Sequence, residues 1–257
     1  MKRVLFSFLL SILFLSCGNN FISPSSYSKD QIDKKYPYWK VGVSNFWVDG
    51  DNDYTELTVS EKRFYLSSLA LIRLIVNSEE FNYVFQKNAD KFVADLTVSK
   101  EEGAIYPVVK GDKLNVDRLI KVIRVVSYDV EYGKGSHKNY QAFSDEGNYH
   151  YSFYGSSIEL LTGKRIWFPN YYLIDWAYNN LYYFSALVFH EHLHNIGFTH
   201  NSATIYAMQD MIQNLGYRIL EGDLKDKYEI SLDELTAYYF TEYKRFLLSS
   251  TVYHSKK

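Results

Sequence analysis

Cysteine is almost absent from this chain of 257 residues, since Cys17 is the single one. An intramolecular disulfide is therefore excluded, and the fold must be held by its apolar core. An excess of positive charge is also missing: 28 Lys and Arg stand against 30 Asp and Glu, and the formal net charge is −2. No basic cluster lies beside an aromatic platform, so nucleic acid is not an expected partner.

The chain begins with an apolar run too short to cross a membrane. Lys2 and Arg3 precede the run, which extends from Val4 to Leu15 and has twelve residues. A spanning helix needs roughly 20 apolar residues. A basic start followed by a short apolar core predicts an export signal over residues 1–17.

Ser16 and Cys17, which follow this core, resemble a bacterial lipobox, although Phe14 and Leu15 depart from its commonest residues. The resemblance implies that Cys17 is lipidated and anchors an exported protein to the cell envelope or surface. The alternative is an ordinary signal peptide with an incidental cysteine. Residues 18–35 are polar and rich in Ser and Asn, which predicts a flexible tether.

The remaining residues, 36–257, contain both strand and helix patterns and no second linker, which predicts a single α+β domain. Alternating apolar residues predict strands, and capping residues followed by a helical period predict helices, with Thr58 and Glu61 at capping-box spacing. The expected strands are 36–48, 92–98, 104–109, 125–132, 149–155 and 163–173, and the expected helices are 58–76, 77–85, 115–123, a helix from Leu181, and 230–248.

Four of the seven histidines crowd into FHEHLHNIGFTH, from Phe189 to His200, at the end of an apolar helix pattern. His190 and His194 are four residues apart and so lie on one face of a helix. Two imidazoles at this spacing suit zinc, and Glu191 can reach a water on that zinc. Gly197 permits a sharp turn with positive φ at the helix end, which is what His200 needs to return to the same metal.

The string HEHLHNIGFTH resembles the metzincin zinc metallopeptidases of the zincin group, because it has His190, Glu191, His194, Gly197 and His200 at all five fixed positions of HExxHxxGxxH. The resemblance implies Zn²⁺ bound by the three histidines, Glu191 as general base and acid, and hydrolysis of peptide bonds. It also implies a zincin-like fold with a twisted mixed sheet, an active-site helix and a small C-terminal helical part. The strand before that helix, within 163–173, would run along the substrate.

Metzincins also have a methionine turn beneath the metal, and Met208 stands eight residues after His200, where such a turn is expected. The stretch 202–216 equally predicts a helix, in which Met208 is an ordinary core residue. The Tyr that some metzincins place two residues after this Met is replaced by Asp210, so Tyr206 and Tyr217 are the candidates for stabilising an oxyanion.

Two other interpretations stay open. The third metal ligand could be a downstream carboxylate in place of His200, and the protein could be a non-catalytic zincin-fold surface lipoprotein that binds a partner.

His192 should face away from the metal, because it lies about 200° around the helix from His190. The carboxylates available as ligands are Glu221, Glu229 and Glu234, and the histidines without ligand-like spacing are His137, His150 and His254.

Overall fold

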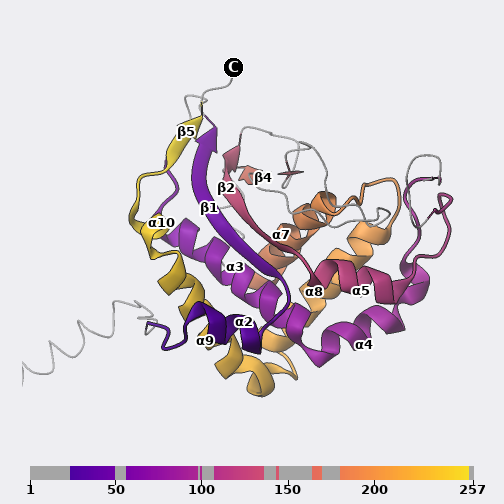
Figure 1. Cartoon of the computed structure of the whole chain (residues 1–257), viewed down its shortest axis with the longest axis horizontal. Helices are drawn as coiled ribbons and strands as arrows, with labels where there is room; N and C mark the ends of the chain where they lie inside the picture. Colours follow the sequence, from indigo (N-terminus) through magenta and orange to yellow (C-terminus); the bar gives the residue numbers. More distant parts are fainter. Residues whose placement is uncertain are drawn as a thin grey trace, which may run out of the picture.

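The computed structural model describes residues 24–49, 56–97, 99, 107–135, 143–144, 164–169 and 180–254. Within these ranges, helices and strands are mixed along the chain, which confirms the α+β class (Figure 1). The elements are α2 Lys29–Lys35, β1 Lys40–Asp49, α3 Val59–Asn77, α4 Glu79–Lys87, the 3₁₀-helix η1 Ala89–Lys91, α5 Val116–Arg124, β2 Ser127–Gly135, β3 Phe143–Ser144, β4 Lys164–Pro169, α7 Leu181–Asn195, α8 Thr204–Leu220, α9 Lys225–Glu242, α10 Lys244–Leu248 and β5 Val252–His254.

The strands form one mixed sheet in the order β3-β4-β2-β1-β5. Strands β4, β2, β1 and β5 run parallel to their neighbours, and β3 pairs antiparallel with β4. The first half of β1 pairs only with β2 in the described structure, because β5 joins β1 from Trp47 onwards. The strand expected within 163–173 is confirmed as β4, although β4 has a partner strand on each side.

Helices α3 and α7 cover one face of the sheet and lie behind β1 and β2 in Figure 1. Helix α3 begins with the expected capping box, in which Thr58 accepts from the N–H of Glu61 and Glu61 accepts from that of Thr58. Tyr65 of α3 is fully buried and donates to the carbonyl of Gly133 in β2, 3.0 Å away. The main apolar core lies between these helices and the sheet.

Helices α8, α9 and α10 form the C-terminal helical part. Rings of α7 and α8 meet at both ends of the pair: Tyr182 lies 5.6 Å from Tyr217, and His190 lies 5.4 Å from Tyr206. The two helices are therefore antiparallel, joined by the loop that carries His200. Helix α8 continues past Gly216, where a helix end was expected. Gly216 instead allows close packing of α7, because a Cβ added to Gly216 would lie only 2.8 Å from the Cβ of Tyr182.

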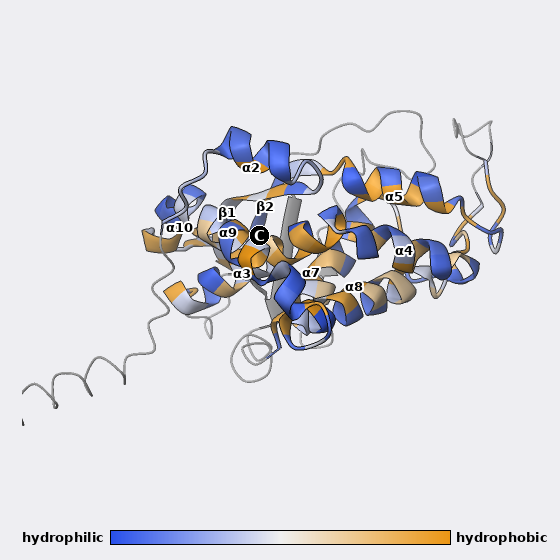
Figure 2. Ribbon diagram, turned by 90° about the horizontal axis from the view of Figure 1, so that it is seen from below, coloured by the Kyte–Doolittle hydropathy of each residue, from blue (hydrophilic) through white to orange (hydrophobic). Residues whose placement is uncertain are grey.

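Three expectations need correction. The flexible tether of residues 18–35 is wrong for Lys29–Lys35, because α2 has a capping box at Ser28, buries Ile32 and packs on α9; in Figure 2, α2 is otherwise hydrophilic. Residues 92–97 form only an isolated bridge, Val93 to Lys113, and residues 107–109 lie in no strand. The alternating pattern of residues 92–97 reflects the burial of Phe92 and Ala94 in a segment that forms no strand.

Other expectations fall outside the described residues: the export signal 1–17 with Cys17, and the strand 149–155. None of the helices in the described ranges is both long enough and apolar enough to span a bilayer.

Candidate metal centre

Helix α7 delivers the first two histidines. From Phe184 to Phe189 the helix is buried on all sides, so its backbone is fixed by packing before the histidines begin. His190 and His194 then lie one turn apart on the same face, with their ring centroids 5.0 Å apart. Their expected convergence is confirmed.

The chain turns sharply after α7, and Gly197 makes the turn possible. Its φ is +101°, a region that side chains with a Cβ rarely adopt. The N–H of Gly197 bonds the carbonyl of His194 at 3.0 Å, and that of Phe198 bonds the carbonyl of Leu193 at 3.2 Å. These two bonds, with the buried pair Phe198 and Leu193, make a Schellman motif. The positive φ at Gly197 is the backbone conformation that the sharp turn requires.

His200 returns to the first two histidines. Its Nε2 lies 2.9 Å from the Nε2 of His190, and its ring centroid lies 4.6 Å from that of His194. The potential ligand nitrogens of the three side chains all lie within 4.8 Å of one another. Zinc is bound by imidazole nitrogens at about 2.0–2.1 Å, so three nitrogens this close fit a single ion.

Hydrogen bonding and burial keep the imidazoles of His194 and His190 in the form that can bind a metal. The Nδ1 of His194 lies 2.8 Å from the carbonyl of Phe198; a carbonyl only accepts, so Nδ1 is the donor and Nε2 carries the lone pair that a metal needs. Burial, with the neighbouring His194 and His200, lowers the pKa of His190 to about 3. His190 is therefore neutral at pH 7, which is the ligand form.

Exposure rises across the cluster from one side to the other. His190 is buried, His194 is half-buried and His200 is exposed. One side of the cluster is thus accessible to solvent. Catalytic zinc sites keep such an open position, whereas structural sites are closed by protein ligands.

Glu191 lies next to His190 and is almost completely buried, with 3% of its surface exposed. Burial raises the pKa of its carboxyl group to about 8. Its Oε2 atom is buried without a hydrogen-bond partner in the described part of the chain. A carboxyl group held in this way takes up or releases a proton near neutral pH, which is the property required of a general base and acid.

His192 faces away from the cluster, as expected, and fastens α7 to the sheet. Its Nδ1 lies 2.5 Å from the hydroxyl of Tyr128, and its Nε2 lies 2.8 Å from that of Tyr132. Asn195, one turn further along, donates to Tyr128 at 3.1 Å. Since Tyr128 and Tyr132 both belong to β2, the side of α7 that faces away from the histidine cluster is hydrogen-bonded to one strand.

Asp95 is a structural partner of the site that the sequence did not reveal. It is fully buried, and its carboxylate accepts a hydrogen bond of 2.5 Å from the backbone N–H of Thr199, the residue before His200. A second bond pair joins the same loops, because the Thr204 hydroxyl donates to the carbonyl of Val93 and accepts from its N–H. Asp95 lies 104 residues before Thr199, so no local pattern could have identified it.

Of the two candidate tyrosines, Tyr206 lies beside the cluster. Its ring stacks on that of His200, with centroids 5.4 Å apart and an angle of 19°. Tyr217 contacts Tyr182 at the far end of α8. Met208 is fully buried within α8, so the structure has the helix alternative in place of a methionine turn.

The other candidate ligands do not join the cluster. The three histidines are the sole group of potential metal ligands found in the described ranges, which does not favour Glu221, Glu229 or Glu234 as the third ligand. Glu234 instead accepts hydrogen bonds from Lys35 and Tyr36. The remaining histidines are His254 in β5 and His137 and His150, which lie outside the described residues.

The chain was compared with protein-family models, curated proteins and solved structures, and no match was found in any of the three. What is shown is a mixed α+β fold with a three-histidine group able to hold a metal ion.

Proposed function

We propose that this protein is a zinc-dependent endopeptidase. The observation that carries the proposal is the convergence of His190, His194 and His200, with the buried carboxyl of Glu191 on the same helix. Three histidines without a carboxylate nearby would suit a structural or storage site as well. The added Glu191 is what peptide hydrolysis requires and a structural site does not.

The arrangement of the chain supports a zincin-like fold. Strands β1 to β4 of the mixed sheet precede a buried helix that carries the first two proposed ligands, and the helices after His200 form a C-terminal part. These are the parts that the resemblance to metzincins implies. Strand β4 immediately precedes the metal helix among the described strands, which supports a role for it beside the substrate.

The residues of this chain divide the chemistry between them. When bound, zinc would supply the positive charge that activates a water molecule and polarises the scissile carbonyl, and that charge would also lower the pKa of Glu191. Glu191 would take the proton of the attacking water and pass it to the leaving amine. Tyr206, which is 47% exposed beside His200, is the hydroxyl placed best to donate to the developing oxyanion.

The test is a metal determination followed by a cleavage assay. A soluble protein that starts after Cys17 should hold about one zinc per chain after dialysis, measured by elemental mass spectrometry. It should cleave members of a proteome-derived peptide library, read by mass spectrometry. Glu191→Gln should keep the zinc and lose cleavage, whereas the matched control Glu229→Gln, at an exposed position on α9, should behave as wild type.

Two results would refute this function. A folded protein without zinc would mean that the histidines do not form the site. A zinc-loaded wild-type protein that cleaves nothing in the library, or a Glu191→Gln variant as active as wild type, would remove the catalytic role. The interpretation as a non-catalytic surface lipoprotein that binds a partner would then replace it.

We further propose that the enzyme works at a bacterial membrane, exported and anchored through a lipid on Cys17. The basis is the N-terminal sequence alone: a basic start, a short apolar core and a cysteine. In cell fractionation, Cys17→Ala should move the protein from the membrane fraction to the soluble one. Retention of this variant in the membrane fraction would contradict the anchor.

A further inference from the structure

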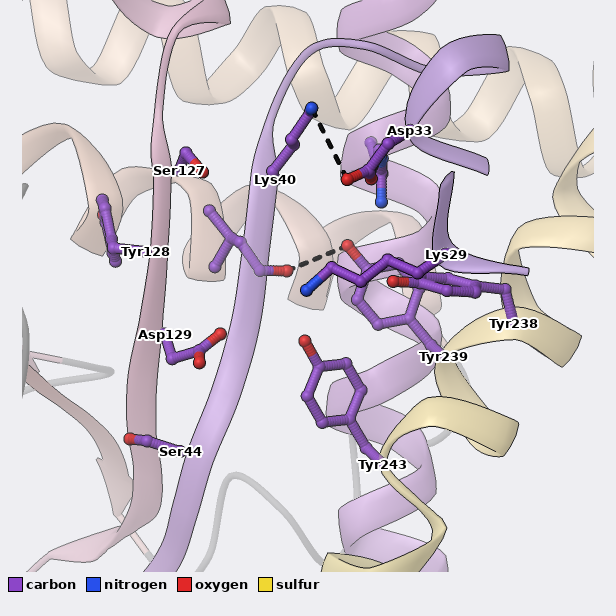
Figure 3. Close-up of a pocket in the computed structure, with 12 residues that line it drawn as sticks. Lys29, Asp33, Lys40, Ser44, Ser127, Tyr128, Asp129, Tyr238, Tyr239 and Tyr243 are labelled. Carbon is purple, nitrogen blue, oxygen red and sulfur yellow. Dashed lines mark hydrogen bonds and ion pairs between the residues drawn. The ribbon is translucent and has the colours of Figure 1, made fainter. Parts of the chain in front are cut away.

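A cavity of about 530 Å³ lies at the first half of β1, between the sheet, α2 and α9 (Figure 3). Its size is within the range of about 300–1,000 Å³ that small-molecule sites have. The metal centre does not use it, and its lining includes none of the three histidines or Glu191. The residues that give it its chemistry are Lys29, Ser44, Ser127, Asp129, Tyr238 and Tyr243.

This cavity lies beside the first half of β1, and Asp129 reaches it from the face of the sheet opposite α7. Tyr128 and Tyr132 of β2 point to α7, where they bond His192. Successive side chains of a strand alternate between faces, so Asp129 points the other way. Gly42 of β1 is the register partner of Asp129. The lining thus contains none of the three clustered histidines, although it includes Tyr128, whose hydroxyl bonds His192.

The walls of the cavity are fixed by groups that bond one another. Arg73 is buried, and its guanidinium donates to Asp33 at 2.6 Å and to the carbonyl of Tyr36 at 2.7 Å, which holds α2 in place. The hydroxyl of Tyr239 donates to the carbonyl of Val41 at 2.9 Å. That bond occupies a carbonyl on the free edge of β1, so a peptide could not add there as a further strand.

Two side chains that line the cavity, Tyr243 and Asp129, come together over the backbone of Gly42. A Cβ added to it would lie 1.9 Å from the hydroxyl oxygen of Tyr243 and 2.2 Å from Oδ1 of Asp129. Both polar atoms therefore converge over bare backbone. In Figure 3, Lys29 reaches across from α2 towards the same part of β1. The ring of Tyr243 is held between Tyr239 and Phe246, with centroids 5.8 and 6.2 Å away.

The convergent groups have unused hydrogen-bonding capacity. Within the described residues, the structure gives no hydrogen-bond or ion-pair partner to the ammonium of Lys29, the carboxylate of Asp129 or the hydroxyl of Tyr243. A ligand here must donate to Asp129 and accept from Lys29. Phosphate is disfavoured because it would lie against the carboxylate, and a simple cation is disfavoured because it would lie against the ammonium.

We propose that this cavity is a saccharide-binding site. A sugar hydroxyl donates and accepts through one oxygen atom, so neighbouring hydroxyls satisfy Asp129, Lys29 and Tyr243 together without adding charge. The phenol groups of Tyr238 and Tyr243 and the hydroxyls of Ser44 and Ser127 also line the cavity, and each can donate to or accept from a sugar hydroxyl. Such a site would hold the protein on a glycan, whatever the metal centre does.

The experiment is a glycan array probed with the soluble wild-type protein, with the strongest neutral oligosaccharide then measured by titration calorimetry. Asp129→Asn replaces a charged acceptor with a weaker neutral one, and Tyr243→Phe removes a hydroxyl, so each should weaken binding about tenfold. The matched controls are Asp90→Asn on η1 and Tyr83→Phe on α4, both exposed positions, and they should bind as wild type.

The proposal is overturned if the array shows no binding, if both cavity variants bind as wild type while retaining the wild-type circular dichroism, or if triglycine or inorganic phosphate binds in competition with the sugar and more tightly. Peptide cleavage by the same preparation is scored separately. Loss of sugar binding with cleavage intact, in Tyr243→Phe, would show that the two sites act independently.

Discussion

Asp95 allows the support of the metal loop to be tested directly. Its carboxylate is buried and accepts from the N–H of Thr199, next to the proposed ligand His200. We expect Asp95→Ala to weaken zinc binding without unfolding the protein. The substitution removes the one hydrogen bond that this N–H makes within the described residues. Bringing His200 into place would then cost additional free energy.

The size of the effect follows from the type of bond. A hydrogen bond to a charged acceptor contributes about 1.5–3 kcal/mol, and a buried donor left without a partner costs about 1–3 kcal/mol. Since about 1.4 kcal/mol is a factor of ten, the zinc dissociation constant should rise roughly 10- to 100-fold. Asp95→Asn keeps an oxygen that accepts from Thr199 and should show a smaller rise.

Zinc affinity should be measured by competition with a chromophoric chelator at fixed pH, with circular dichroism as the check on folding. Asp90→Ala is the matched control, because Asp90 is exposed on η1 and close to Asp95 in the chain. If Asp95→Ala were folded and bound zinc within about twofold of wild type, the loop would need no support from Asp95, and the reasoning would be wrong.

Three further predictions concern stability. Gly197→Ala should destabilise by more than about 1 kcal/mol in chemical denaturation, because φ is +101° there. Phe189→Ala should cost about 3–5 kcal/mol, since this fully buried ring packs 5.3 Å from Trp39. Burial acts to raise the pKa of Glu234, but hydrogen bonds from Lys35 and two tyrosines outweigh it and lower the pKa. Its stabilising contribution should be complete above about pH 5 and lost as the pH falls below the usual glutamate value of about 4.3, and a urea-denaturation series should show this loss reduced in Glu234→Gln.

The sequence was sufficient for features that are encoded locally. The capping box of Thr58 and Glu61, the face shared by His190 and His194, and the positive φ of Gly197 each depend on residues within one or two helical turns. Such patterns are legible because the geometry of a helix or turn fixes which neighbours meet.

Features that depend on long-range packing could not be read in this way. Asp95 meets Thr199 only because the chain folds, and α2 forms only because Asp33 and Ile32 find partners in α3 and the core. By composition alone, Lys29–Lys35 has too little apolar surface to pack, and its single buried Ile gives no helical period. The alternation of apolar residues at 92–97 predicted a strand that does not form, since side chains in a packed loop also alternate in burial.

Helix α7 shows why the two kinds of information meet at the metal centre. A surface helix has one apolar face, whereas α7 is buried over most of its circumference and uses its polar residues on two sides. On one side His192 is fixed by Tyr128 and Tyr132 of the sheet; on the other His190 faces His200. The hydrogen bonds on the first side restrict rotation and sliding of the helix, and Asp95 restricts the loop that bears His200. The three imidazoles are therefore positioned by the fold before any metal arrives, which is the condition for a site that binds zinc and leaves one side open for chemistry.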